Sequence, residues 1–207
     1  MSKRVKNLLL IIFNMNTESQ IPFDSEKYQN ICTKQNMLLK VIKEDNIYQL
    51  DFETENKNYN LDELMDFKIY SLIERLNEDV IEKIEIIKQY SDTEIDLLFV
   101  FKRIGASVGM QQKYMYIKTH RIKTDNLIIF KSFDIGEPIT HYLIDKAERV
   151  VCKFADLTII PYNNKLRINY TFNIDLCEDL PTYMDNLIGL MMKKIFYNLK
   201  LFIEKME

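Results

Sequence analysis

The sequence predicts an α+β fold in which one curved antiparallel sheet of about six or more strands faces a long C-terminal helix. From residue 81 onward, apolar residues repeat at every second position in a series of short runs, which is typical of strands with one covered face. After Pro181, apolar residues recur every three or four positions almost to the chain end, which indicates a helix. Such a helix must bury its apolar stripe, and the apolar face of the sheet is the available partner.

Length and composition indicate one domain covering residues 1–207, with 1–22 forming an N-terminal helix and lead-in. Only 4 Gly and 4 Pro are present, which argues against flexible linkers or a disordered half. The net charge of −3 gives no general attraction to nucleic acid. We expect no nucleic-acid partner and a monomer.

The cysteines Cys32, Cys152 and Cys177 are odd in number and form no CxxC pair, and the chain has only 2 His. We therefore expect no metal site and no disulfide, and we expect reduced thiols of a cytoplasmic protein. No apolar run approaches the ~18 residues of a membrane span. Residues 3–13 lack a cleavage site and are short for a signal peptide, so we favour a helix packed on the domain.

The N-terminal half predicts several small elements. Residues 3–14 look helical, and 23–28 offers Asp24 or Ser25 as the cap of a helix that would continue into the thirties. Residues 40–54 read as two short strands around an acidic turn. Residues 58–79 predict a helix, which Asn60 would cap with Glu63 reaching back to it.

The remaining chain predicts strands at 81–90, 94–104, 113–122, 126–133, 149–160 and 165–175. In the last one the apolar and polar faces separate cleanly. Leu166, Ile168, Tyr170, Phe172 and Ile174 share one face, and the alternate positions are polar or charged. This alternation predicts one buried and one solvated face.

Short motifs in this half resemble the START (steroidogenic acute regulatory-related lipid-transfer) family over roughly residues 45–205. Arg149 in "ERVVCK", then "LTIIPY" (157–162), "YTFNIDL" (170–176) and Leu180-Pro181 occur in the family's order. The chain departs from the family at Gln112-Lys113-Tyr114, where an arginine-aspartate-phenylalanine motif is usual, and it has no Trp.

The resemblance implies a helix-grip fold, a curved sheet wrapped around the C-terminal helix, with a lipid-sized tunnel between them. It implies a lipid-binding or lipid-transfer protein that holds one phospholipid, sterol or ceramide-like molecule, needs no cofactor and meets membranes transiently. The residues expected to bind lipid are Asp96, Tyr114, Tyr116, Lys118, Arg149, Tyr170, Phe172, Met184, Leu187, Ile188, Met191 and Ile195.

Three of these assignments have an alternative. The family often places a basic residue facing the cavity at Lys118, with Asp96 as a possible partner, but an outward, solvated Lys118 is the alternative. Arg149 is favoured as the partner of a carboxylate on the sheet rather than of lipid. His120, Arg121 and Lys123 would form a basic loop over the tunnel mouth, and a plain solvated hairpin end is favoured over that role.

Two other functions remain open. A helix-grip protein-interaction domain with a filled cavity is compatible with the many bulky strand residues. An enzyme on the same scaffold would need converging acids and bases, and the sequence has no catalytic motif. A lipid-binding protein should instead contain an apolar tunnel of roughly several hundred Å³.

Overall fold

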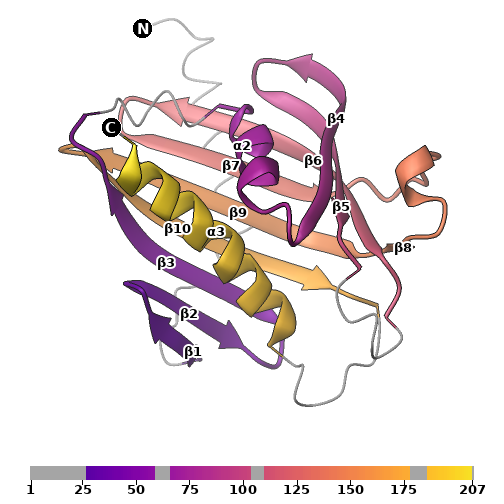
Figure 1. The fold of residues 1–207 in the computed structure, drawn as a ribbon, viewed down its shortest axis with the longest axis horizontal. Coiled ribbons are helices and arrows are strands. Elements are labelled where there is room, and N and C mark those ends of the chain that lie inside the picture. Colours follow the sequence, from indigo (N-terminus) through magenta and orange to yellow (C-terminus); the bar gives the residue numbers. More distant parts are fainter. Residues whose placement is uncertain (1–26, 59–65, 104–109, 178–185, 207) are drawn as a thin grey trace, which may run out of the picture.

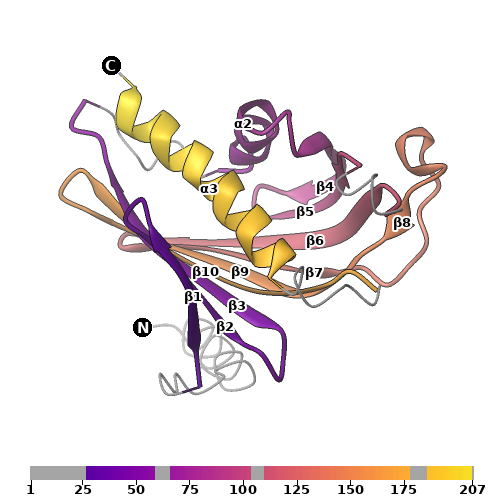
Figure 2. The ribbon, with the colours of Figure 1, turned by 60° about the horizontal axis from the view of Figure 1, so that its bottom comes forward.

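The computed structural model describes residues 27–58, 66–103, 110–177 and 186–206. Within them, ten strands form one sheet in the order β1-β2-β3-β10-β9-β7-β6-β5-β4, with β8 parallel to β6. Figure 1 shows α3 lying across this sheet, and Figure 2 shows the sheet curving around it. The expected antiparallel sheet and C-terminal helix are therefore confirmed. The strands are β1 (Gln29–Lys34), β2 (Met37–Ile42), β3 (Ile47–Glu55), β4 (Ile81–Ser91), β5 (Glu94–Phe101), β6 (Lys113–Thr124), β7 (Leu127–Asp134), β8 (Glu148–Arg149), β9 (Val151–Tyr162) and β10 (Lys165–Asp175).

The first strand corrects the sequence analysis. The helix expected from 23–28 into the thirties is wrong, because Gln29–Lys34 is a strand paired with β2. Gln35 and Asn36 both have positive φ, 61° and 56°, which is the geometry of a two-residue hairpin turn. The two strands expected in 40–54 are confirmed as β2 and β3, and Asn46 at φ 52° lies in the turn between them.

The helices are shorter than expected. α2 spans Ile69–Leu76, and the preceding residues form a turn in which the Asp66 carboxylate accepts a hydrogen bond from the Lys68 amide at 2.7 Å. That local bond competes with the helix at this position. Expected features at 3–14, Asn60, Glu63 and Pro181 lie outside the described residues. α3 spans Leu187–Lys205, and Asn186 before it is not helical.

The sheet has two differently covered faces. On the concave face, α2 and α3 cover the main core, which includes Leu50, Ile117 and Ile168. On the opposite face a smaller core of Leu98, Val100 and Ile144 lies beneath the 3-10 turn η3 (Tyr142–Ile144). The side chains of β5 are therefore buried on both faces of the sheet. The sequence analysis had expected one of these faces to be solvated.

β10 follows the predicted alternation closely. Its apolar set is buried, apart from a half-buried Tyr170, and Arg167 and Asp175 on the other face are exposed. Asn173 is the exception, because it lies on the polar face and is nevertheless buried. Its amide nitrogen donates a hydrogen bond of 2.8 Å to the Asp45 carbonyl, which satisfies the buried donor.

Candidate ligand-binding site

An enclosed cavity of about 60 Å³ lies between the sheet and the two helices. Its wall is almost entirely apolar and comes from α2, α3 and the strands β5, β6, β7, β9 and β10. The lining residues are Ile69, Tyr70, Ile73, Phe99, Met115, Ile117, Phe130, Ser132, Cys152, Ala155, Leu157, Tyr170, Ile174, Met192, Ile195 and Phe196. A volume of this size accommodates one or two waters rather than a lipid, so in this conformation the expected tunnel is closed.

Hydroxyl groups form the main polar point in this wall. Thr119 and Ser132 are opposite each other on β6 and β7, and their hydroxyl oxygens are 2.9 Å apart. The Tyr70 hydroxyl approaches both of them from α2. Burial raises the pKa of Tyr70 to about 12, so the phenol is neutral at physiological pH.

Tyr170 supplies a second hydroxyl to the same cavity. Its ring packs on Phe172 and Phe196, with ring centres 4.7 and 4.8 Å away. Burial raises its pKa well above 10, and nearby Cys152 and Tyr70 add to the shift. Tyr170 and Tyr70 thus lie close to each other on the cavity wall, and both are uncharged.

Cys152 completes this uncharged wall. Its thiol is 1% exposed, and burial raises its pKa to about 12. A protonated, desolvated thiol behaves as a small apolar group with little nucleophilic reactivity. Cys32, Cys152 and Cys177 are all free thiols.

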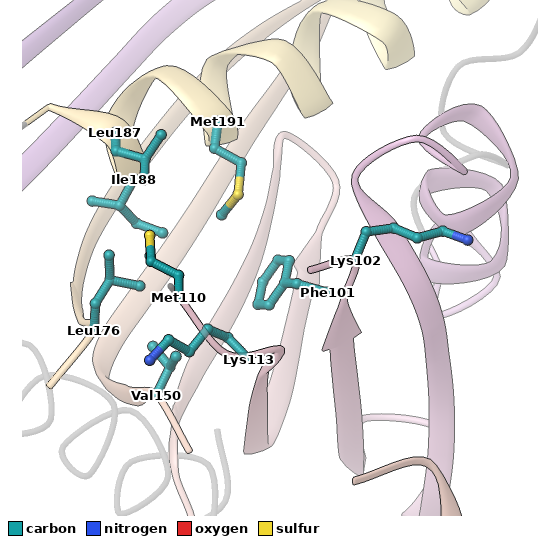
Figure 3. Close-up of a pocket in the computed structure, with 9 residues that line it drawn as sticks. All are labelled: Phe101, Lys102, Met110, Lys113, Val150, Leu176, Leu187, Ile188 and Met191. Carbon is teal, nitrogen blue, oxygen red and sulfur yellow. The ribbon is translucent and has the colours of Figure 1, made fainter. Parts of the chain in front are cut away.

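A second, smaller cavity of about 30 Å³ lies at the N-terminal end of α3. Figure 3 shows Leu187, Ile188 and Met191 of α3 on one side of it, facing Met110 and Phe101. Lys102, Lys113, Val150 and Leu176 complete its lining. The ammonium of Lys113 is buried and forms an ion pair of 2.7 Å with Glu148.

The C-terminal half of α3 is held by polar contacts. Asn77, fully buried, donates a hydrogen bond of 2.9 Å to the Ile73 carbonyl and accepts one of 2.8 Å from Asn198. Asn56 donates to the carbonyls of Ile203 and Met206 at 2.7 and 2.8 Å. These amides connect α2 and the end of β3 to the last turns of α3.

The N-terminal half of α3 depends mainly on close apolar packing. Gly189 lies directly on the ring of Tyr48, where an added Cβ would come within 2.6 Å of the ring carbon Cδ1. Tyr48 is in turn stacked on Phe172 at 5.3 Å. Polar contacts also reach this half: Lys193 donates to Gln35 in the β1–β2 turn at 3.1 Å, and Lys194 forms an exposed ion pair with Asp79.

A wider groove of about 480 Å³ lies open to solvent beside β3 and the C-terminal end of α3. Its lining carries acids and bases in pairs, including Lys165 with Glu55 at 3.3 Å and Lys200 with Glu204. A charged, solvated groove of this kind does not suit an apolar ligand.

The structure brings some of the expected lipid-binding residues to the cavities. Tyr170 and Ile195 line the larger cavity, and Leu187, Ile188 and Met191 line the smaller one. Phe172 lies in the core behind Tyr170 rather than on the wall. Met184 lies outside the described residues.

Four of the expected residues lie on the opposite face of the sheet. Met115 and Ile117 face the cavity, so the alternating positions Tyr114, Tyr116 and Lys118 point away from it. Asp96 lies opposite Lys118 on β5 and shares its face. Placing these side chains in the cavity wall is therefore wrong.

The expected pairing of Lys118 with Asp96 is confirmed, at 2.9 Å. The ammonium also lies 3.1 Å from Glu94 and 3.9 Å from the ring centre of Tyr90, so it is neither free nor simply solvated. Tyr90 donates a hydrogen bond of 2.8 Å to the same Asp96 carboxylate. Burial disfavours the charged ammonium, but its hydrogen bonds to Asp96, Glu94 and Tyr90 prevail and raise the pKa of Lys118 above its usual value.

Arg149 has the structural role favoured from the sequence. Its guanidinium forms an ion pair of 3.0 Å with Asp134 and donates a hydrogen bond of 2.9 Å to the Glu137 carbonyl. These contacts fix the chain around β8 to the end of β7. They leave no direct role for Arg149 in the wall of either cavity.

The basic hairpin does not lie at a cavity mouth. Figure 1 places the β6–β7 turn near the C-terminal end of α3, whereas the smaller cavity is at the other end of that helix. His120 stacks on Phe133 with ring centres 5.7 Å apart, Arg121 lies 5.5 Å from the ring of Phe67, and Lys123 is exposed. None of the three lines either cavity.

Several wall residues were missed from the sequence. Tyr70 lies on the expected helix but outside its apolar stripe, and Ser132 is a small polar residue within an apolar strand. Met192 and Phe196 directly follow the expected residues Met191 and Ile195, so the apolar stripe of α3 is one residue wider on these turns than expected. A hydroxyl on an otherwise apolar face, as at Ser132, is the one signal that could have indicated the polar point.

No family model matches the sequence, and no curated protein sequence matches it. Solved structures do match the fold. Human StAR-related lipid transfer protein 5 is 11% identical with a TM-score of 0.69, over 97% of this chain and 94% of that one. This chain has a START-like helix-grip fold.

Other solved START domains agree. The lipid transfer and protein localization domain of human StarD13 (DLC2) is 12% identical with a TM-score of 0.64, over 100% of this chain and 99% of that one. A STAR-related lipid transfer protein fragment from Xanthomonas axonopodis is 10% identical with a TM-score of 0.64, over 86% and 99%. At these identities the likeness establishes the fold of this chain and no more. No helix among the described residues is both long and apolar enough to cross a bilayer.

Proposed function

We propose that this protein binds one lipid molecule between the sheet and α3 and carries it between membranes without altering it chemically. The observation that carries the proposal is the enclosed apolar cavity beneath α3, whose wall contains no charged side chain among the described residues. A wall of this kind favours hydrocarbon and excludes water. The START-like fold supports the same use of the space under the helix.

Lipid entry requires the cavity to enlarge, because a lipid-sized site needs roughly 300–1,000 Å³. The packing supports an opening at the N-terminal half of α3, where apolar contacts predominate. Met110, Met191 and Met192 lie along this path, and methionine side chains adapt to irregular apolar ligands. Movement of this half would join the two cavities into one.

The chemistry of the wall supports transport rather than catalysis. Tyr70 and Cys152 each have a pKa raised to about 12, so neither exchanges a proton near neutral pH. The free thiols support a reducing, cytoplasmic setting for a monomeric carrier. Leu190, in the first turns of α3, is 46% exposed and is a candidate for transient membrane contact.

A filled-cavity interaction domain is the second candidate, and the small volume of the cavity favours it. Native mass spectrometry after incubation with sterols, phospholipids and sphingolipids separates the two. We expect a one-to-one lipid adduct. A bare protein mass with every lipid would overturn the proposal in favour of the interaction domain.

A matched pair of variants locates the site. Ala155→Leu would fill the cavity from β9, whereas Thr158→Leu makes a similar change on the opposite face of the same strand. We expect Ala155→Leu to lose the adduct and Thr158→Leu to keep it, with both proteins folded by circular dichroism. Equal lipid capture by the two variants would place the ligand elsewhere.

A further inference from the structure

We propose that the open edge of β3 binds an extended peptide with lysine or arginine at every second residue, and that the peptide joins the sheet as a further strand. This surface shares no residue with either cavity, so its use does not depend on lipid binding. Three features point to it: the place where β2 ends, the backbone groups left unpaired there, and the carboxylates that border them.

β3 continues past the end of its neighbour β2. Met37, the first residue of β2, pairs with Phe52, and the hairpin turn to β1 comes directly before it. β3 runs on through Glu53–Glu55, with β10 on one side and no described strand on the other. Figure 1 shows this part of β3 passing the β1–β2 hairpin beside the C-terminal end of α3. The result is a sheet edge about 10 Å long.

The backbone of this edge is largely unpaired. Along a strand, successive residues direct their N–H and C=O groups alternately to the two sides. The Asn56 N–H donates to the Asn164 carbonyl on the β10 side at 3.2 Å, so Glu53 and Glu55 direct theirs to the open side. There the Glu53 carbonyl accepts from the Lys200 ammonium at 2.8 Å. In the described part of the chain, no backbone group pairs with the two glutamate N–H groups or with the Glu55 carbonyl. An added strand would satisfy them.

The groove of about 480 Å³ provides the space for such a strand. Besides β3, it is lined by Asn36 of the β1–β2 turn and by Lys200 and Glu204 of α3, which form an ion pair with each other. Thr54 also lines it, and this side chain is 2% exposed with no hydrogen-bond partner for its hydroxyl among the described residues. A buried hydroxyl without a partner is unfavourable, and a polar side chain of the peptide would satisfy it.

Carboxylates select the side chains of the added strand. Phe52 packs against α3, so Glu53 and Glu55 present their carboxylates on the opposite face of the sheet. A peptide residue directly opposite either glutamate would lie about 5 Å away on that same face. Lys165 and Arg167 lie opposite them on β10, on the side away from the open edge. The open edge therefore presents acid, and a base at alternate positions of the peptide complements it.

Synthetic peptides test the proposal without altering the protein. The probe is a short fluorescein-labelled peptide in which lysine and threonine alternate, and fluorescence anisotropy at low salt measures its binding. The same peptide with glutamate in place of lysine should bind at least about tenfold more weakly. N-methylation of the lysine residues removes the N–H groups that face β3 and should also cost at least about tenfold. N-methylation of the threonine residues, whose N–H groups face away, should cost less than about threefold.

Three variants locate the binding site. Glu55→Gln removes one carboxylate and should weaken binding about two- to fivefold. Glu55→Pro also removes the N–H that faces the open edge, a position where a strand tolerates proline, and should weaken binding at least about tenfold. The control is Glu82→Gln, which removes an acid of similar exposure, paired with Lys102, from the opposite edge strand β4, and should leave binding unchanged. Circular dichroism checks that all three proteins are folded.

Each outcome decides for or against the added strand. Binding of the lysine peptide that is weakened both by Glu55→Pro and by methylation of the lysines supports it. Equal binding of the glutamate peptide, the same effect from both patterns of N-methylation, or no binding at about 1 mM peptide would overturn it. Dimerisation that Glu55→Pro abolishes, without peptide binding, would assign the edge to a second copy of the chain instead. Lipid capture is measured separately by native mass spectrometry, so the failure of one proposal leaves the other standing.

Discussion

Replacing Gly189 by Ala should destabilise the protein even though alanine is the better helix former. The new Cβ would lie 2.6 and 2.7 Å from ring carbons Cδ1 and Cε1 of Tyr48, which is closer than carbon atoms can approach. Tyr48 cannot easily retreat, because it is 2% exposed and stacked on Phe172. Overpacking of this kind costs about 1–3 kcal/mol. The higher helix propensity of alanine relative to glycine offsets about 1 kcal/mol of this cost.

The expected net loss is therefore about 1 kcal/mol in the free energy of unfolding, or about 2–4 °C in melting temperature for a chain of this size. Urea titration followed by circular dichroism measures it. The control is a double-mutant cycle with Tyr48→Leu, which makes room for the new methyl group and should remove most of the penalty. If Gly189→Ala instead stabilises the protein by the full propensity difference, the contact with Tyr48 does not determine the position of α3.

Three further predictions concern other parts of the molecule. Asn77→Ala should lower the free energy of unfolding by about 2 kcal/mol, because it removes the buried hydrogen bond to the Ile73 carbonyl and the part-buried one from Asn198, and urea titration checks it. Lys118→Leu should cost about 3 kcal/mol by leaving the buried Asp96 carboxylate without its cation. Since the pKa of Lys118 is raised, the ammonium is fully charged below 10.5, so unfolding titrations should show a constant deficit from pH 7 up to that pH, with lipid capture unaffected. At pH 8, iodoacetamide should label exposed Cys177 and spare Cys152 until the protein is denatured, as intact mass spectrometry would show.

The sheet and the last helix were predictable because their apolar periods are long and regular. β10 shows this best, since its alternation correctly identified the face that packs toward α3. β1 was not predictable from its own residues, because most of them are exposed and carry no apolar alternation. Its structure depends on the turn at Gln35 and Asn36, which returns the chain onto β2.

The site was harder to predict than the fold because β6 presents apolar side chains on both faces. Met115 and Ile117 face the cavity, while Tyr114 packs into the smaller core on the other side. A strand buried on both faces has no polar set to define which direction is outward. Which face of β6 lines the cavity depends on α2 and α3 covering one side of the sheet and η3 the other. These elements are distant from β6 in sequence, so the orientation of β6 could be determined only from the structure.

The contacts of α3 differ between its two halves in a way that suits a carrier. Hydrogen bonds from Asn56 to the Ile203 carbonyl and from Asn198 to Asn77 hold the C-terminal half, and both would be broken if that half moved. The N-terminal half rests mainly on Gly189 and apolar side chains, and its polar contacts, Lys193 with Gln35 and Lys194 with Asp79, lie nearer the middle of the helix. An incoming hydrocarbon could replace the apolar contacts with similar ones. Opening at the N-terminal half therefore costs less than opening at the other end. Under the proposed lipid binding, the amide-held C-terminal end of α3 would stay in place while its N-terminal end exchanged protein contacts for lipid contacts.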